Sequence, residues 1–385
     1  INSMDDFVIN NKSRFGIRTG SQYLDGLRDD RNVWMHGKKV KDVTNEDGLK
    51  RCAATLANFI DKQHDPKYLN DITYLDEDGD RCALAFQIPK NKEDIKARGK
   101  SYYEWAKWSN GYFGRTPDYK NASLMSFAAG SSFLEKGTKG QGGKAMAQNM
   151  INYYNYVRKN DKVLTHTLVN PTYNHQQGYK GKFSEKVALQ VVKETDTGII
   201  VNGARLLATL GPLADEIEVY PSTVLKATPD NIPFAFAFAI PIATKGLRLI
   251  CRDSYDLGKS NFDAPLSSRY EEMDAVIVFD NVLVPWERVF VKDDAIQARE
   301  IYFKTPAHCY GNHQSNVRYW SKMELITGLC NKVAKATGAD QIPAVRETLG
   351  KMSSLEANLS LSLIHISEPT RPLYISYAVV GVKKK

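Results

Sequence analysis

Three residues of types that can handle a proton or a negative charge stand out in the first half of the chain: Arg115, Tyr119 and His166. Arginine is permanently cationic, the tyrosine hydroxyl both donates and accepts, and histidine titrates near neutral pH. Tyr119 follows Arg115 by four residues, so a helix that begins at Pro117 would let both side chains converge on one pocket. Residue type alone leaves ordinary alternatives open: a surface ion pair for Arg115, packing for Tyr119 and a structural role for His166.

Several well-known chemical motifs fail here. Gly140–Ala145 (GQGGKA) has the spacing of a dinucleotide-binding fingerprint, but that motif needs a preceding strand, and a helix is expected there. No glycine-rich run ends in Gly-Lys-Ser or Gly-Lys-Thr, and no Cys-x-x-Cys pair or Gly-x-Ser-x-Gly elbow exists. His308 and Cys309 are adjacent and make a poor chelate. The sequence therefore predicts no metal site.

Composition narrows the class of protein. Of the 385 residues, 42% are hydrophobic and 25% are charged, which is ordinary for a soluble globular protein. The most apolar stretch, Ile232–Ala243, is too short for a membrane span, contains two prolines and alternates Phe with Ala, which is typical of a strand. The five cysteines are odd in number and far apart, and the N-terminus lacks a signal-peptide pattern. We therefore expect a cytoplasmic protein without a membrane segment.

The net charge of +8 does not by itself indicate nucleic acid. The lysines are dispersed, and the densest cluster is Lys383–Lys385 at the very end of the chain. Basic charge of this kind suits an anionic cofactor and substrate, so nucleic-acid binding is not expected.

The pattern of apolar residues divides the chain into helices, strands and helices again. Asp47–Gln63 carries Leu49, Cys52, Leu56, Phe59 and Ile60 on one helical stripe. Further helices are predicted at Asn91–Trp108, Tyr119–Glu135 and Ala145–Lys159. Eight short strand-like segments follow and predict a closed barrel or a sandwich. They are Leu164–Val169, Val187–Glu194, Gly198–Val201, Glu216–Tyr220, Phe234–Ile240, Leu247–Arg252, Ala275–Phe279 and Val289–Val291.

We therefore predict an α+β fold in consecutive domains. Residues 1–162 form a mainly helical N-terminal domain, residues 163–293 a middle β domain, and residues 294–360 the start of a C-terminal helical bundle. Residues 361–385 are expected to be a non-native tail. The order of helices, β domain and helices resembles that of acyl-CoA-dehydrogenase-like flavoproteins.

Several stretches, spread in order over most of the chain, resemble the oxygenase component of the 4-hydroxyphenylacetate 3-monooxygenase family. The segment Gly114–Asn121 (GRTPDYKN) is similar to that family's Gly-Arg-(Ser/Thr)-Pro-Asp-Tyr signature. The other stretches are Arg18–Leu24, Asn32–Gly37, Lys39–Thr44, Thr165–Pro171, Asn202–Thr209, Pro265–Ala275 and Phe279–Phe290.

The resemblance implies a two-component, FAD-dependent aromatic hydroxylase. Such an enzyme receives FADH2 from a separate NAD(P)H:flavin oxidoreductase, reacts it with O2 through a C4a-hydroperoxyflavin, and hydroxylates a phenol ortho to its hydroxyl group. It also implies a homotetramer for full-length members. A 4-hydroxyphenylacetate-like phenol is expected, although the family's substrates vary.

The resemblance also assigns residues. Arg115 would stabilise phenolate charge, Tyr119 would hydrogen-bond the phenol oxygen, and His166 would accept the phenol proton with a suitable pKa. Ser222 and Thr223 would contact the carboxylate end of the substrate, although they are equally plausible turn formers. The expected flavin contacts are His166, Thr167, Leu168, Thr172, Tyr173, Asn174, His175 and Thr209.

The ends of the chain carry their own expectations. From about Ser360 the family pattern stops, and Ser362–Pro372 resembles a peptide translated from sequencing-adapter DNA, so we expect a C-terminally truncated chain whose initiator is Met4. Residues 361–385 should pack poorly, and the helices after Asp294 should expose apolar faces. The alternatives are an inactive fragment or a flavoprotein resembling 4-hydroxybutyryl-CoA dehydratase, whose Cys-x-x-x-Cys pair is missing near Arg115.

Overall fold

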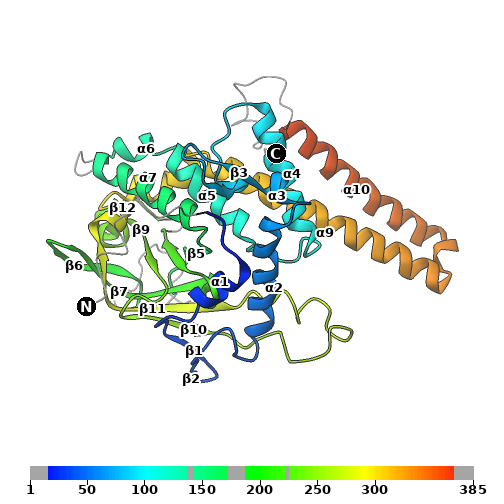
Figure 1. Cartoon of the computed structure of the whole chain (residues 1–385), viewed down its shortest axis with the longest axis horizontal. Helices are drawn as coiled ribbons and strands as arrows, with labels where there is room; N and C mark the ends of the chain where they lie inside the picture. The colour runs from blue at the N-terminus through cyan, green and yellow to red at the C-terminus, as the bar shows by residue number, and fades with distance from the viewer. Residues whose placement is uncertain (1–15, 138–142, 172–186, 222–224, 368–385) are drawn as a thin grey trace.

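The computed structural model describes residues 16–137, 143–171, 187–221 and 225–367. Helices lie along one side of a β region, and a long helical hairpin extends away from it (Figure 1). The succession of helices, strands and helices is the acyl-CoA-dehydrogenase-like arrangement that the sequence predicts. No helix within these ranges is long and apolar enough to cross a membrane.

The first part of the chain contains the expected helices. The apolar stripe predicted at residues 47–63 is the buried face of α2, and Cys52, Leu56, Phe59 and Ile60 are all buried there. The single helix predicted at residues 119–135 is divided at Gly130 into α5 and α6. The elements are α1 (Gly20–Gly26), β1 (Val33–Met35), β2 (Lys38–Lys39), α2 (Lys50–Asp61), η2 (Lys62–His64), α3 (Leu69–Ile72), β3 (Thr73–Leu75), β4 (Arg81–Ala83), η3 (Leu84–Phe86), α4 (Lys92–Lys107), α5 (Pro117–Ala129), α6 (Ser132–Glu135) and α7 (Gly143–Asn160).

The β region consists of two main sheets. One has the strand order β2-β1-β10-β11-β7-β6 and the other β12-β9-β8-β5. All eight predicted strands are present, three of them longer than expected, and β1 and β2 join the first sheet from the N-terminal part of the chain. The remaining elements of the region are β5 (Leu164–Thr167), β6 (Gln190–Thr195), β7 (Gly198–Thr209), η5 (Gly211–Leu213), β8 (Glu216–Val219), η6 (Pro229–Phe234), β9 (Phe236–Pro241), β10 (Leu247–Cys251), β11 (Asp274–Pro285), η7 (Trp286–Arg288) and β12 (Val289–Lys292).

Of the two alternatives that the strand count suggested, a closed barrel or a sandwich, the closed barrel is wrong. Where β5 approaches β7, the two strands are joined mainly through side chains rather than through a continuous ladder. The hydroxyls of Thr165 and Thr167 donate to the carbonyls of Thr209 and Leu206, at 2.6 and 2.7 Å. These bonds pair carbonyl groups of β7 with hydroxyls of β5, without a continuous backbone ladder between the two sheets. The apolar side chains between the sheets form a common core.

The second sheet separates two environments. Phe236 and Phe238 of β9 point into the core between the sheets, whereas Ala237 and Ala239 face the helices. By the same alternation, Thr165 and Thr167 of β5 face β7, and His166 faces the helical side. The parallel pairing of β5 with β8 sets His166 opposite Glu218. Polar groups on this face can therefore meet side chains from α5.

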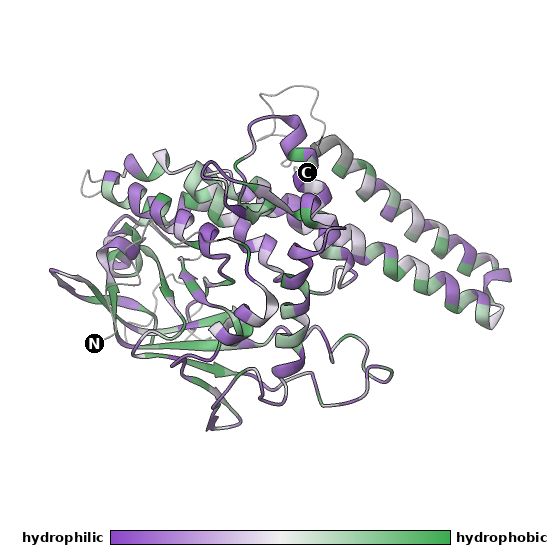
Figure 2. Ribbon diagram, viewed as in Figure 1, coloured by the Kyte–Doolittle hydropathy of each residue, from purple (hydrophilic) through white to green (hydrophobic). Residues whose placement is uncertain are grey.

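The C-terminal part consists of α8 (Ala295–Lys304), α9 (Ala307–Thr337), η8 (Ala339–Gln341) and α10 (Pro343–Ser367). The prediction that residues from 361 onward form an irregular segment is wrong up to residue 367, because α10 continues and Leu363 is buried beside Tyr102 and Val317. Residues 368–385 lie outside the described ranges. The predicted apolar exposure is present, since Leu329, Val333 and Leu355 are more than half exposed on this hairpin (Figure 2).

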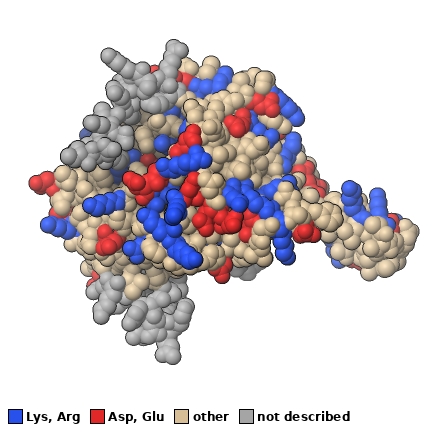
Figure 3. All heavy atoms as spheres, turned by 60° about the horizontal axis from the view of Figure 1, so that its bottom comes forward, with Lys and Arg blue, Asp and Glu red and all other residues tan. Residues whose placement is uncertain are grey.

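Charged side chains of both signs are intermingled on the face shown in Figure 3. Lysines and arginines lie there beside aspartates and glutamates, and no continuous basic stripe is formed on this face. Nucleic acid is recognised mainly through such stripes, so this face gives no support to a nucleic-acid partner.

Candidate active site

Arg115 and Tyr119 converge at the start of α5. The helix begins at Pro117, whose fixed φ suits the first helical position, and Thr116 occupies the N-cap. Arg115 lies just before the helix, and its guanidinium carbon is 4.8 Å from the centre of the Tyr119 ring. Both side chains are half-buried. The convergence predicted from their spacing is therefore confirmed, while their catalytic roles stay predictions.

His166 lies beside the same pair. Its ring centre is 6.3 Å from that of Tyr119, and its buried Nδ1 atom has no hydrogen-bond partner among the residues that the structure describes. Burial lowers the pKa of His166 well below its usual value, and the nearby Lys120 and Arg115 cations lower it further. The expectation of a pKa suited to holding the phenol proton is wrong, because this environment keeps the imidazole neutral. A neutral imidazole can still accept a hydrogen bond at the unpaired nitrogen.

A buried ion pair that the residue patterns did not reveal lies next to His166. Lys120 and Glu218 are almost fully buried, and the Lys120 ammonium is 2.6 Å from the Glu218 carboxylate. Tyr220 also donates to Glu218 at 3.1 Å. A signal was available, since Lys120 directly follows Tyr119 in the Gly114–Asn121 signature. On a helix as buried as α5, a lysine needs a partner.

A second set of charges holds the segment before α5. The backbone N–H groups of Gly114 and Arg115 donate to the two carboxylate oxygens of Glu272. Arg318 of α9 donates from Nη1 to the Gly111 carbonyl at 2.9 Å. Glu272 lies in the stretch Pro265–Ala275 on which the resemblance rests, but its contact with Arg115 could not be read from the sequence because 157 residues separate the two.

The residues expected to contact flavin are only partly within the described ranges. Thr167 is buried with its hydroxyl committed to Leu206, whereas Leu168 is exposed. The hydroxyl of Thr209 donates to Asp274 at 2.6 Å, and Thr209 lines a cavity of about 410 Å³ that also touches Glu272. The other expected contacts, Thr172, Tyr173, Asn174, His175, Ser222 and Thr223, lie outside the described residues.

The described surface near His166 fits a flat, partly apolar cofactor such as FAD. Leu168, Val169 and Leu207 are large apolar side chains that are 37%, 40% and 59% exposed. Leu168 and Val169 follow His166 closely along the chain, and Val169 pairs with Leu206, the neighbour of Leu207. The Nδ1 atom of His166 has no hydrogen-bond partner among the described residues. An isoalloxazine ring has an apolar face and a polar edge, so this combination suits it.

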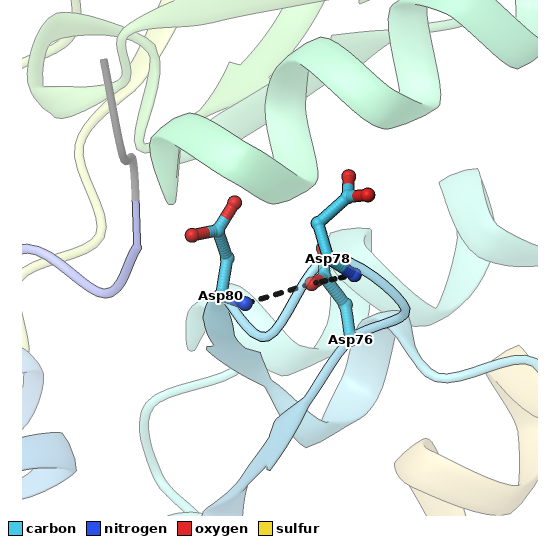
Figure 4. A group of neighbouring side chains, drawn as sticks. All are labelled: Asp76, Asp78 and Asp80. Atoms are coloured by element: carbon cyan, nitrogen blue, oxygen red, sulfur yellow. Dashed lines mark hydrogen bonds between the residues drawn. The ribbon is translucent and has the colours of Figure 1, made fainter. Parts of the chain in front are cut away.

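Three acidic residues elsewhere resemble a cation site but are already neutralised. Asp76, Asp78 and Asp80 lie in the turn between β3 and β4 (Figure 4). Asp76 accepts from the backbone N–H groups of Asp78 and Asp80, at 3.0 and 2.9 Å. The Lys159 ammonium contacts all three carboxylates. The turn is thus held by its own backbone and by protein cations.

The matches to known proteins cover most of the chain. Residues 19–291 match the family "4-hydroxyphenylacetate 3-hydroxylase N terminal" and residues 298–370 its "C terminal" counterpart. The chain is 40% identical over 336 residues to the 4-hydroxyphenylacetate 3-monooxygenase oxygenase component of Thermus thermophilus, covering 87% of this chain and 67% of that protein. It is also 30% identical to a 2,4,6-trichlorophenol monooxygenase of Cupriavidus pinatubonensis, over 87% of this chain and 64% of that protein.

A solved structure supports the same relation. The fold superposes with a TM-score of 0.84 and 38% identity on an oxygenase component of 4-hydroxyphenylacetate 3-monooxygenase complexed with FAD and 4-hydroxyphenylacetate. That comparison covers 91% of this chain and 71% of the other. The resemblance, the fold and the expectation of an FAD-dependent monooxygenase are confirmed at the level of the family. The chain belongs to the 4-hydroxyphenylacetate 3-hydroxylase family.

Proposed function

We propose that this protein hydroxylates a phenol at the carbon next to its hydroxyl group, using O2 and FADH2 delivered by a separate NAD(P)H:flavin oxidoreductase. The observation that carries the proposal is the cluster of Arg115, Tyr119 and His166, with an unpaired nitrogen and two cations around one small region. Its setting in a family whose relatives bear monooxygenase names, one of them solved with FAD and a phenol, supports it.

The residues suit the activation of a phenol. A phenol has a pKa of about 10, so at neutral pH its ring is a poor nucleophile unless phenolate character is stabilised. Arg115 would supply positive charge near the phenol oxygen, and such preorganised charge favours the phenolate, whereas the charge of Lys120 is largely compensated by Glu218. Tyr119 would donate a hydrogen bond to that oxygen. The neutral imidazole of His166 would accept a hydrogen bond from the phenol hydroxyl.

Bound reduced FAD supplies the activation of O2. The apolar Leu168, Val169 and Leu207 would contact the flavin ring and exclude water from it. The substrate class is an anionic or neutral phenol of the size of 4-hydroxyphenylacetate, with Ser222 and Thr223 proposed for its carboxylate end. Assembly into a tetramer stays part of this proposal, as inferred from the resemblance.

Cofactor delivery gives the first test. The purified protein should not oxidise NADH alone, because no nicotinamide site is expected in the sequence. Addition of a flavin reductase, FAD and NADH should yield a hydroxylated product from a phenol panel that includes 4-hydroxyphenylacetate and 2,4,6-trichlorophenol. Direct NADH oxidation by the single chain would contradict the two-component assignment.

A further inference from the structure

The short segment from Gly111 to Arg115 is held on two sides by groups that are distant in sequence. On one side, the N–H of Gly114 donates to Glu272 Oε2 at 2.9 Å, and the N–H of Arg115 donates to Oε1 of the same carboxylate. Two consecutive amides thus use both oxygens of one side chain. Hydrogen bonds to a charged acceptor are the stronger kind, so this contact fixes the backbone from which the Arg115 side chain departs.

On the other side stands α9. Arg318 donates from Nη1 to the carbonyl of Gly111 at 2.9 Å. Gly111 has φ +71°, and a Cβ atom there would lie 2.3 Å from the Arg318 carbonyl oxygen. At Gly114 a Cβ atom would lie 3.3 Å from Glu272 Oε2 and 3.8 Å from the Arg318 guanidinium carbon. Glycine is therefore required at position 111 for this close approach, whereas at position 114 a Cβ atom would force a small shift of the Glu272 side chain.

The charges in this region compensate one another. Burial raises the pKa of the Glu272 carboxyl, and the two backbone bonds with the Arg115 and Arg318 charges counter that effect. Burial lowers the pKa of Arg318, and Arg115 lowers it further, whereas Glu272 opposes both. Lys322, one turn further along α9, has its pKa lowered by burial and by Arg318. A negative charge at Glu272 therefore balances several cations that would otherwise repel one another.

We propose that Glu272 is a positioning residue for the hydroxylation reaction, acting through the backbone of Gly114 and Arg115 and assisted by Arg318 of α9. This inference rests on the proposed function, because it assigns a purpose to the position of Arg115. The proposed role requires no contact between Glu272 and a reacting atom. Glu272 sets the direction of the Arg115 guanidinium over the Tyr119 ring, and it ties that direction to the C-terminal helices.

The carboxylate is essential to the inference. A glutamine has one carbonyl oxygen and an NH2 group, and the NH2 group cannot accept a hydrogen bond from a backbone amide. Glu272→Gln would therefore leave one of the two amides without an acceptor while keeping the shape of the side chain. Glu272→Asp keeps both acceptor oxygens on a shorter stem and should restore part of the lost function.

The experiment compares three single variants of the full chain: Glu272→Gln, Glu272→Asp and the matched control Glu216→Gln. Glu216 is a buried glutamate, and Glu216→Gln would weaken its 2.6 Å ion pair with Arg288, which lies outside the Arg115 segment. The readouts are the thermal midpoint, amide hydrogen exchange of a peptide covering residues 111–116, and the hydroxylated product formed per NADH consumed.

We expect Glu272→Gln to exchange its 111–116 amides roughly tenfold faster, as the loss of one hydrogen bond implies. It should also convert several-fold less of the consumed NADH into product, with partial recovery in Glu272→Asp. The control should lose thermal stability without either change. Equal exchange and equal product yield in Glu272→Gln and Glu216→Gln would overturn the inference.

The same design separates this inference from the proposed function. If the unaltered protein forms no hydroxylated product, the proposed function fails, and hydrogen exchange alone decides the contact. Faster exchange confined to Glu272→Gln would still support the role of Glu272 in fixing the segment, and unchanged exchange would refute it.

Discussion

Within the part of the chain that the structure describes, Asp76 and Glu272 each accept hydrogen bonds from two backbone N–H groups. Asp76 does so within its own turn, from Asp78 and Asp80 (Figure 4). Glu272 does so across the fold, from Gly114 and Arg115, which lie 158 and 157 residues away. The bonds are of the same kind, and the distance along the chain is what differs.

The surroundings differ as well. The Asp76 turn is neutralised by Arg158 and Lys159, and its other two acids are partly or largely open to solvent. Glu272 lies among Arg115 and Arg318, beside residues proposed to act on substrate. A carboxylate that binds its own turn stabilises only that turn, whereas one that binds a distant segment makes the geometry of a functional side chain depend on the tertiary fold.

The largest effect is expected for Arg115, whose backbone Glu272 binds, and for its neighbour His166. Arg115→Ala and His166→Ala should each lower product formation by about 10²-fold or more, the usual scale for a lost charge stabiliser or a lost hydrogen bond to the reacting group. Hydrogen peroxide released per NADH should rise, because reduced flavin would react with O2 without an activated ring. Product yield and peroxide are measured together in the reductase-coupled assay. Unchanged coupling in both variants would make these residues structural.

Asp118 offers a third carboxylate in the same neighbourhood, but one without paired amides. It is buried, and burial raises its pKa to about 6, although Gln314 donates to it at 3.2 Å. Because its folded-state pKa exceeds the unfolded value, the stability that it contributes is present at low pH and is lost as the pH rises through about 6. Asp118→Asn should therefore raise the free energy of unfolding by about 1–3 kcal/mol at pH 8, and by less at pH 5. Denaturant unfolding at both pH values is the measurement, and an equal effect at both would contradict the assigned pKa.

The contrast between local and distant contacts also explains what the sequence could predict. Helices such as α2 and the eight strands follow from apolar periodicity, which is local information. The convergence of Arg115 with Tyr119 follows from spacing and from the proline at position 117. Each of these features depends on residues that lie close together in the sequence.

The errors concern contacts between distant segments. The choice between a closed barrel and a sandwich stayed open because strand counting does not reveal that Thr165 and Thr167 make side-chain bonds where a barrel would need a backbone ladder. The ordinary pKa expected for His166 overlooked Lys120, whose charge is set beside it by packing. The roles of Glu272 and Arg318 likewise require the tertiary fold. The type of a residue identifies it as a candidate site residue, whereas its charge state depends on the environment in the folded protein.

Asp76, which binds only its own turn, should affect the stability of the protein but not its hydroxylation activity. Asp76→Ala removes the acceptor of two amides and leaves Arg158 with less compensation, so we expect a loss of about 1–2 kcal/mol in the free energy of unfolding. The product formed per NADH should stay at the unaltered value. Asp78→Ala is the matched control, because its exposed carboxylate accepts from no backbone amide in this turn and should cost less than about 0.5 kcal/mol. A fall in coupling in Asp76→Ala would mean that the two regions communicate.

The smallest expected effect concerns metal ions at the same turn. Three carboxylates within reach of one another suggest a divalent cation, but the Lys159 ammonium contacts all of them, and Arg158 reaches Asp76 at 3.6 Å. A cation entering the turn would have to displace or repel that ammonium. Millimolar Ca²⁺ or Mg²⁺ should therefore stabilise the unaltered protein by less than about 0.5 kcal/mol, since ligand stabilisation follows the ratio of ligand concentration to Kd. Thermal unfolding with and without each ion measures the effect, and Lys159→Gln provides the comparison. Stabilisation by Ca²⁺ in the variant alone would show that the lysine is what keeps the ion out, whereas stabilisation in the unaltered protein would show that this turn binds metal and does more than hold itself together.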